Sequence, residues 1–213
     1  MKKIISVFLT IAIVFLLVGC MPNPSDTTTN SDKTQKAELS RGKIEGDVYK
    51  NEYLGFEFTK PASWVYSTDE EMAALLNMAA ETLISDNNFK EALENNTAIY
   101  DMMVVDSISR SNINVGYENL SKSFSTNITE KQYAEVLRNQ LTSVTTIDYT
   151  FSDTYDTVKL GETEFTRWTC SATANGITMT RVYYLHKIDG YMGFVIVTIM
   201  DSHSISDIEA MFH

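Results

Sequence analysis

Apolar and polar positions divide the first 46 residues into two unlike segments. Apolar residues fill Ile4–Val18 almost without a break, directly after Lys2 and Lys3. This run is shorter than the roughly 20 residues that a transmembrane helix needs, and it suits the hydrophobic region of a signal peptide. From Cys20 the sequence is polar, and apolar periodicity first appears near Val48. Such a segment buries too little apolar surface to offset the entropy of ordering it. We predict a signal peptide over residues 1–19, a disordered tether over residues 20–46 and one folded domain over residues 47–213.

The remainder of the chain alternates between strand and helix patterns. Residues 53–58 and Ala98–Asp106 have the apolar content of strands. Two segments, Thr68–Glu71 and Thr129–Gln132, have the spacing of a capping box, in which the first and fourth residues satisfy each other's backbone. Each predicts the start of a helix. Further patterns predict a short helix within 89–94, strands near 113–117, 147–151 and 158–160, and a short C-terminal helix opening at 206–209.

Two dipeptides near the C-terminus predict tight hairpins. Asn175-Gly176 and Asp189-Gly190 lie between long runs of β-forming residues, and a type I′ turn needs positive φ at both of its central residues. Two-residue loops would place Trp168 opposite Tyr183, and Tyr183 opposite Ile196. Both faces of the resulting sheet carry apolar residues, so both faces must be covered. We predict an α/β (α+β) fold: a three-layer α-β-α sandwich around a central, largely antiparallel sheet.

The two cysteines have different predicted roles. Leu17-Val18-Gly19-Cys20 resembles the lipobox that the lipoprotein signal peptidase recognises, where small residues precede the cut and the thiol carries the lipid. We predict lipidation at Cys20 and an anchor in the cell membrane, with the domain on the extracytoplasmic side. An uncleaved N-terminal anchor is the alternative, and it gives the same location. Cys170 then has no intramolecular partner. The predicted register places it beside Trp168, so we expect a buried, inert thiol.

The charge of the chain restricts its partners. The formal net charge is −11, and cleavage before Cys20 would remove two lysines and no acidic residue, which gives −13. An acidic domain is repelled by phosphate backbones and by anionic lipid headgroups. We therefore expect no nucleic-acid binding, and contact with the membrane only through the lipid anchor. Attraction of a basic protein surface stays open, although a charge of this size also serves solubility alone.

Catalytic and metal-binding patterns are absent from the sequence. It contains no nucleophile elbow, zinc-protease motif, phosphate loop or EF-hand loop. Of the histidines, His186 lies on a predicted strand, His203 in a predicted loop and His213 at the terminus. Asp101 and Asp106 are five residues apart on one predicted strand, so strict alternation sends them to opposite faces. We predict no catalytic residues, no metal site and no cofactor.

One motif suggests a family. Residues 56–64, Phe-Glu-Phe-Thr-Lys-Pro-Ala-Ser-Trp, follow Tyr53-Leu54-Gly55 and resemble the opening of PsbP-like domains, where a Gly-Phe-x-Phe strand runs into Pro-x-x-Trp. The resemblance to bacterial lipoproteins of that superfamily extends over about Val48 to Met211. It implies an α-β-α domain of a superfamily that includes an extrinsic subunit of photosystem II and other non-catalytic protein-binding modules. The match covers a packing motif and carries no functional residue with it.

These observations together favour a membrane-anchored, extracytoplasmic lipoprotein that acts by binding. We expect an envelope protein as its partner. Two alternatives stay open: an enzyme of unrecognised type and a small-solute-binding lipoprotein. A pocket with converging polar groups would favour either alternative, whereas an exposed apolar patch would favour a protein partner.

Overall fold

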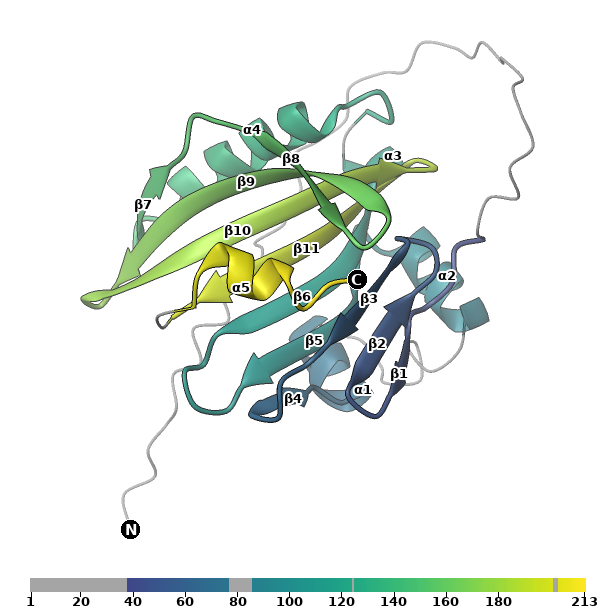
Figure 1. The fold of residues 1–213 in the computed structure, drawn as a ribbon. Coiled ribbons are helices and arrows are strands. Elements are labelled where there is room, and N and C mark those ends of the chain that lie inside the picture. The colour runs from purple at the N-terminus through teal and green to yellow at the C-terminus, as the bar shows by residue number, and fades with distance from the viewer. Residues whose placement is uncertain (1–37, 77–85, 124, 201–202) are drawn as a thin grey trace.

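The computed structural model describes residues 38–76, 86–123, 125–200 and 203–213. The signal peptide, Cys20 and most of the predicted tether lie outside these ranges. An antiparallel sheet of eight strands forms the centre of the fold, in the order β4-β5-β6-β11-β10-β9-β7, with β8 also paired to β9 (Figure 1). A separate sheet has the order β1-β2-β3. The α+β class and the largely antiparallel sheet agree with the sequence-based prediction.

The elements have the following bounds. The strands of the small sheet are β1 (Lys43–Glu45), β2 (Val48–Asn51) and β3 (Phe56–Thr59). The strands of the large sheet are β4 (Trp64–Tyr66), β5 (Ala98–Asp106), β6 (Asn112–Asn119), β7 (Asp148–Phe151), β8 (Asp156–Leu160), β9 (Thr163–Ala174), β10 (Ile177–Ile188) and β11 (Tyr191–Ile199). The helices are α1 (Asp69–Leu76), α2 (Asp86–Asn95), α3 (Leu120–Ser123), α4 (Glu130–Thr142) and α5 (Ile205–Glu209).

Two hairpins determine the register of β9, β10 and β11. Asn175 and Asp189 have φ of 51° and 49°, and the glycine after each also has positive φ. Trp168 is paired with Tyr183, and Tyr183 with Ile196. The predicted register is therefore confirmed at both turns. Every side chain on these three long strands is thereby assigned to one face or the other.

Helix α4 covers one face of the large sheet, which we call the α4 face. The predicted capping box is present, because Thr129 and Gln132 bond each other's backbone. The helix buries Tyr133, Ala134, Leu137 and Leu141 in a core cluster with residues of β9, β10 and β11. This contact forms the first of the two outer layers.

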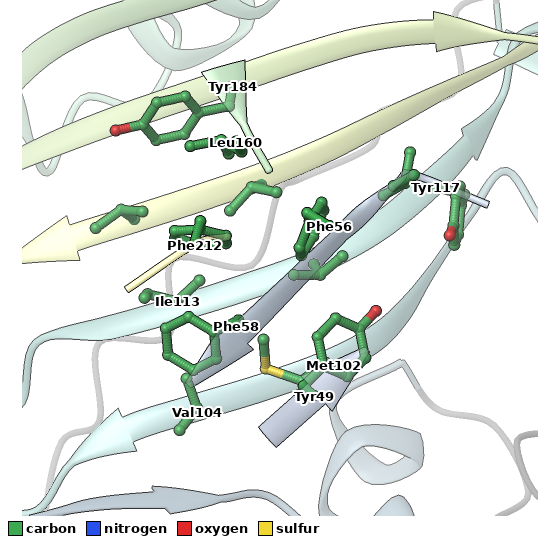
Figure 2. Close-up of a cluster of buried hydrophobic side chains, with 14 of the residues drawn as sticks. Tyr49, Phe56, Phe58, Met102, Val104, Ile113, Tyr117, Leu160, Tyr184 and Phe212 are labelled. Atoms are coloured by element: carbon green, nitrogen blue, oxygen red, sulfur yellow. The ribbon is translucent and has the colours of Figure 1, made fainter. Parts of the chain in front are cut away.

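The opposite face is covered by a mixed layer. The small sheet and α5 lie across it, as Figure 1 shows. Phe56, Phe58 and Phe212 pack onto strand residues such as Ile113 and Val104 (Figure 2), and helices α1 and α2 contribute to the same cluster. The third layer is thus present, and the structure adds that it contains a small β-sheet as well as helices.

The fold begins before the predicted boundary at Asp47. Strand β1 starts at Lys43, within the predicted tether, and pairs with β2. The amide of Gly42 also bonds Asp101 in the core. The sequence pattern missed this strand because all three of its residues are exposed, so they show no apolar alternation.

Two helical details also differ from prediction. The apolar spacing of Met72, Leu75, Ala79 and Leu83 predicts that they share the buried face of the first helix. Leu75 is 41% exposed, whereas Met72 and Ala73 are buried. The C-terminal capping box is formed by Ser204 and Asp207, two residues earlier than predicted. The predicted buried positions Ala79 and Leu83 lie outside the described residues. Within the described ranges, no helix has the length and apolar character to cross a membrane.

Cys170 should resist a thiol reagent until the domain unfolds. Its side chain is buried on the α4 face, and burial raises the pKa of its thiol to about 11, although Arg181 opposes this shift. The reagent needs both access and thiolate, and the folded state supplies neither. We expect labelling of the Cys20→Ser chain, which retains Cys170 alone, to follow unfolding in urea. A Thr126→Cys control, at an exposed position, should label at once, and equally fast labelling of Cys170 would contradict its burial.

Candidate functional site

Buried polar groups are the places where this fold departs from simple packing. An unpaired buried polar atom costs free energy, so each one has a structural or functional reason. The described core contains eight buried polar or charged side chains: Asn51, Asp101, Asp106, Ser111, Glu118, Asn119, Arg181 and Thr198. Asp101, Glu118 and Arg181 are the three that carry charge well inside the layers, and their environments differ.

A β-bulge directs Asp101 toward the small sheet. The pairing of β5 with β6 shifts between Tyr100 and Met102, so Asp101 is an extra residue on its strand. An extra residue reverses the alternation that follows it. Our prediction that Asp101 and Asp106 point to opposite faces is therefore wrong, because it assumed an unbroken strand. The two carboxyls still form no acid-base pair, since the Asp106 carboxylate accepts bonds from Ser109 and Ile108 in the β5–β6 turn.

Asp101 is held in a closed hydrogen-bond network. Its carboxylate accepts from the Tyr49 hydroxyl at 2.5 Å, from Asn51 Nδ2 at 2.9 Å and from the amide of Gly42 at 2.9 Å. The guanidinium of Arg41 approaches it at 3.6 Å. Burial raises the pKa of Asp101 to about 6, although each of these contacts lowers it. The network fastens the small sheet to β5. The Asp101 carboxylate is already bonded to donors of the chain itself.

Glu118 makes a second buried contact, on the α4 face, although its Oε1 atom has no hydrogen-bond partner among the described residues. It accepts a hydrogen bond from the hydroxyl of Tyr133, which fastens β6 to α4. Burial raises the pKa of Glu118, and hydrogen bonds from Ser123 and Tyr133 lower it. Because the phenol already occupies one carboxylate oxygen, this pair is explained by packing of the helix.

Arg181 has no such explanation. Its side chain is buried on the α4 face, between Met179 and Tyr183 of the same strand and opposite Cys170. In the part of the chain that the structure describes, no carboxylate forms an ion pair with it. Its nearest electrostatic partners are the Tyr183 and Tyr149 hydroxyls and the Cys170 thiol. The Cys170 thiol is neutral at physiological pH, because its pKa is raised to about 11. The positive charge is therefore uncompensated.

The groups around Arg181 are also short of hydrogen bonds. The guanidinium carbon lies 5.4 Å from the centre of the Tyr183 ring, which gives a cation–π contact. The Nε atom of Arg181 and the hydroxyl of Tyr183 are buried without hydrogen-bond partners in the described residues. Burial raises the pKa of Tyr149, and the nearby guanidinium of Arg181 lowers it. Arg181 and Tyr183 lie on β10, and Tyr149 lies on β7, with β9 between the two strands. We call Arg181, Tyr149 and Tyr183 the Arg181 cluster.

The histidines that the sequence analysis considered do not join this cluster. The Nδ1 atom of His186 lies 3.0 Å from the carbonyl oxygen of Glu164, and the Nε2 atom of His213 lies 3.3 Å from the hydroxyl of Thr59. His203 lies before α5. No group of three or more His, Cys, Asp or Glu residues is arranged to hold a metal ion in the described parts of the chain.

The α4 face is covered at one end of the sheet and open at the other. Backbone pairing aligns Cys170, Arg181, Thr198, Asn112, Val105 and Val65 across the sheet from β9 to β4. Exposure increases along this row: Arg181 is 5% exposed, whereas Val65 is 56% exposed. Ile108, in the turn after β5, is 82% exposed. The backbone amide of Ser107 donates a hydrogen bond to the carbonyl oxygen of Ser63, which joins that turn to the segment just before β4.

Comparison with known proteins gives structural matches alone. No protein-family model and no curated protein matches the chain. Its structure is similar to the solution structure of cyanobacterial PsbP (CyanoP) from Synechocystis sp. PCC 6803, at 10% identity and a TM-score of 0.46, over 86% of this chain and 97% of that chain. It is also similar to a crystal structure from Bacteroides thetaiotaomicron, at 10% identity and a TM-score of 0.41, over 83% of this chain and 48% of that chain. The first is a PsbP, the family that the N-terminal motif resembles.

The stability of the protein should fall between pH 4 and pH 7 because of Asp101. A folded-state pKa of about 6 lies above the unfolded value of 3.8, so the neutral carboxyl contributes stability below pH 3.8, and this contribution is lost as pH rises through 6. The loss approaches roughly 3 kcal/mol. Urea unfolding of Asp101→Asn should lack this component. Asp106→Asn is the control: burial favours a higher pKa for Asp106, but hydrogen bonds from Ser109 and Ile108 lower it to about 2, below the tested range. If the free energy of unfolding changed with pH equally in the wild type and in Asp101→Asn, the raised pKa of Asp101 would be refuted.

Proposed function

We propose that this protein is a lipoprotein anchored through Cys20 on the extracytoplasmic side of the cell membrane, and that its domain is a non-catalytic binding module for an envelope protein. The proposed anchor rests on the sequence, where a positive N-terminus, an apolar run and a lipobox occur in the order that lipoprotein export requires. The proposed binding function rests on the distribution of buried and exposed groups in the domain.

Binding rather than catalysis is favoured by the state of the buried carboxylates. Asp101 and Glu118 are the buried acids with raised pKa values, which is the usual feature of a general acid. Each is already bonded to a tyrosine hydroxyl inside the core. Arg181, for which the described residues supply no ion-pair partner, stays protonated at any physiological pH and therefore cannot exchange protons in a reaction.

The observation that carries the proposed protein partner is the open end of the α4 face. Val65 lies on β4, the terminal strand of the large sheet, and Ile108 projects from the adjoining turn. Exposed apolar side chains at a strand edge favour contact with another chain. A lipid anchor would raise the effective concentration of this surface near membrane-bound partners, so a modest affinity would suffice.

The first test concerns the anchor. Lipidation requires the thiol, so Cys20→Ser should leave the precursor uncleaved by the lipoprotein peptidase. Mass spectrometry of the N-terminus gives the result directly. Recovery of a mature wild-type chain that begins at another residue, without lipid, would refute the proposed anchor.

The second test concerns the partner. A photo-crosslinking side chain placed at Ile108 in the full-length protein should capture one or a few envelope proteins in cells. Val65→Lys should reduce this capture several-fold, since a charge opposes apolar contact, while changing stability by only about 0.5 kcal/mol at so exposed a site. Ile177→Lys is the matched control, because Ile177 is 55% exposed but lies at the start of β10, after the β9–β10 turn.

Deletion of residues 21–37 with Cys20 retained should also reduce capture, because the domain would lose the reach of its tether. Capture that is indifferent to both Val65→Lys and the deletion would contradict docking through this surface.

A further inference from the structure

The backbone of β4 is bonded to its neighbour on one side only. β4 is the terminal strand of the large sheet, and β5 is the strand that pairs with it (Figure 1). The amide of Ser67 donates to the carbonyl oxygen of Met103, and the amide of Ser107 donates to the carbonyl oxygen of Ser63. The direction of bonding alternates from residue to residue along an antiparallel strand. Because Ser63 and Ser67 bond toward β5, the residues Trp64 and Tyr66 direct their backbone groups outward.

Three of these outward groups have no partner among the described residues. They are the carbonyl oxygen of Trp64 and both the amide and the carbonyl oxygen of Tyr66. The amide of Trp64 is used, since it donates to the carbonyl oxygen of Pro61 in the preceding turn. The edge of β4 therefore offers donors and acceptors of the kind that an added strand would pair with.

The other sheet edges of the described structure are protected, and β4 is not. The outer side of β3 is covered by the C-terminus, because Glu57 and His213 exchange backbone hydrogen bonds. The edge strands β1, β7 and β8 carry charged residues, including Lys43, Asp148 and Lys159 respectively. Cover and charge are the usual devices that keep an edge from pairing with another chain. Strand β4 has the sequence Trp-Val-Tyr and carries neither.

The surface next to this edge is acidic. Helix α1 follows β4 closely and has Asp69, Glu70 and Glu71 in its first turn. Glu70 and Glu71 are exposed, and neither forms an ion pair with a described residue. Lys60, in the turn before β4, is already paired with Asp47 at 2.6 Å. The charge here and the net charge of −11 attract a basic segment and repel a second copy of this chain.

We propose that the outer edge of β4 binds an extended, basic segment of the partner protein as an added strand. This inference rests on the docking function proposed above and specifies how docking occurs. In strand addition, main-chain hydrogen bonds supply affinity and alternate side chains supply specificity. The residue opposite Val65 shares its face of the sheet, so an apolar residue suits that position. Lysine or arginine suits the end of the segment that lies beside Glu70 and Glu71.

The test is binding of a fluorescent peptide, Lys-Lys-Thr-Val-Thr-Val-Lys-Lys, to the full-length protein in non-ionic detergent, measured by fluorescence anisotropy. One control peptide has glutamate in place of every lysine. The other is N-methylated at both threonine amides, which removes donors that flank the valine while keeping every side chain. We expect the basic peptide to bind, and each control to bind roughly ten-fold more weakly.

A matched pair of variants at Tyr66 tests the backbone contact. Tyr66→Pro removes the outward amide and keeps the bonds at Ser63 and Ser67, and proline is tolerated where a strand amide faces outward. Tyr66→Ala loses the same side chain, including its hydroxyl bond to the carbonyl oxygen of Asp47, but keeps the amide. We expect Tyr66→Pro to bind the basic peptide roughly ten-fold more weakly than Tyr66→Ala does.

A second pair tests the charge and is independent of whether Tyr66→Pro folds. Glu70→Gln should weaken binding of the basic peptide roughly two- to five-fold, since it removes an exposed charge beside the edge. Glu162→Gln removes an equally exposed charge from the β8–β9 turn and should leave binding unchanged.

Several results would overturn strand addition by a basic segment: no binding of the basic peptide, equal binding of either control peptide, or equal binding by the two Tyr66 variants. A concentration-dependent dimer that Tyr66→Pro abolishes and Tyr66→Ala retains would assign the edge to a second copy instead. In cells, capture at Ile108 that falls with Val65→Lys but is equal in the two Tyr66 variants would refute strand addition and leave the docking function standing.

Discussion

The register of β9, β10 and β11 is the constraint on which the rest of this structure depends. Two hairpins with positive φ at Asn175 and Asp189 align three long strands, so each side chain on them is assigned to a face. A slip of one residue would exchange the two faces of a strand. Trp168 and Tyr183 would then leave the core beneath α4, and Val182 and Tyr184 would leave the core beneath the small sheet. Both outer layers are therefore positioned by two turns.

The sequence predicted this central part well because turn chemistry and alternation are local. Positive φ restricts residue choice strongly, and the pairing of three strands then follows by counting. The capping box at Thr129 was equally local, and it placed the start of α4 correctly. Strand β1 was missed because its backbone pairs with β2 while its side chains stay exposed, which leaves no apolar pattern to read.

The candidate site was predicted less well, for two physical reasons. A β-bulge has no reliable sequence signature, so the direction of Asp101 could not be obtained from alternation alone. Arg181 did have a signal that our prediction did not use: counting two residues from the predicted Trp168–Tyr183 pair puts Arg181 opposite Cys170, as the structure shows. What the sequence could not show is whether a carboxylate from a distant element would meet it there. Glu118 lies on the same face, but it is bonded to Tyr133.

The three buried charged side chains differ in the contacts that the folded chain supplies to them. Asp101 is surrounded by donors that belong to the chain, and it joins two sheets, so its burial is explained within the folded protein. Glu118 is explained in the same way by its bond to α4. Arg181 differs from both acids, because its contacts are the ring of Tyr183 and the hydroxyl of Tyr149 and include no ion pair among the described residues. The α4 face is unevenly covered. At its open end, Val65 is exposed on β4, a strand that has no outer neighbour among the described residues. The proposed binding function rests on this exposed edge.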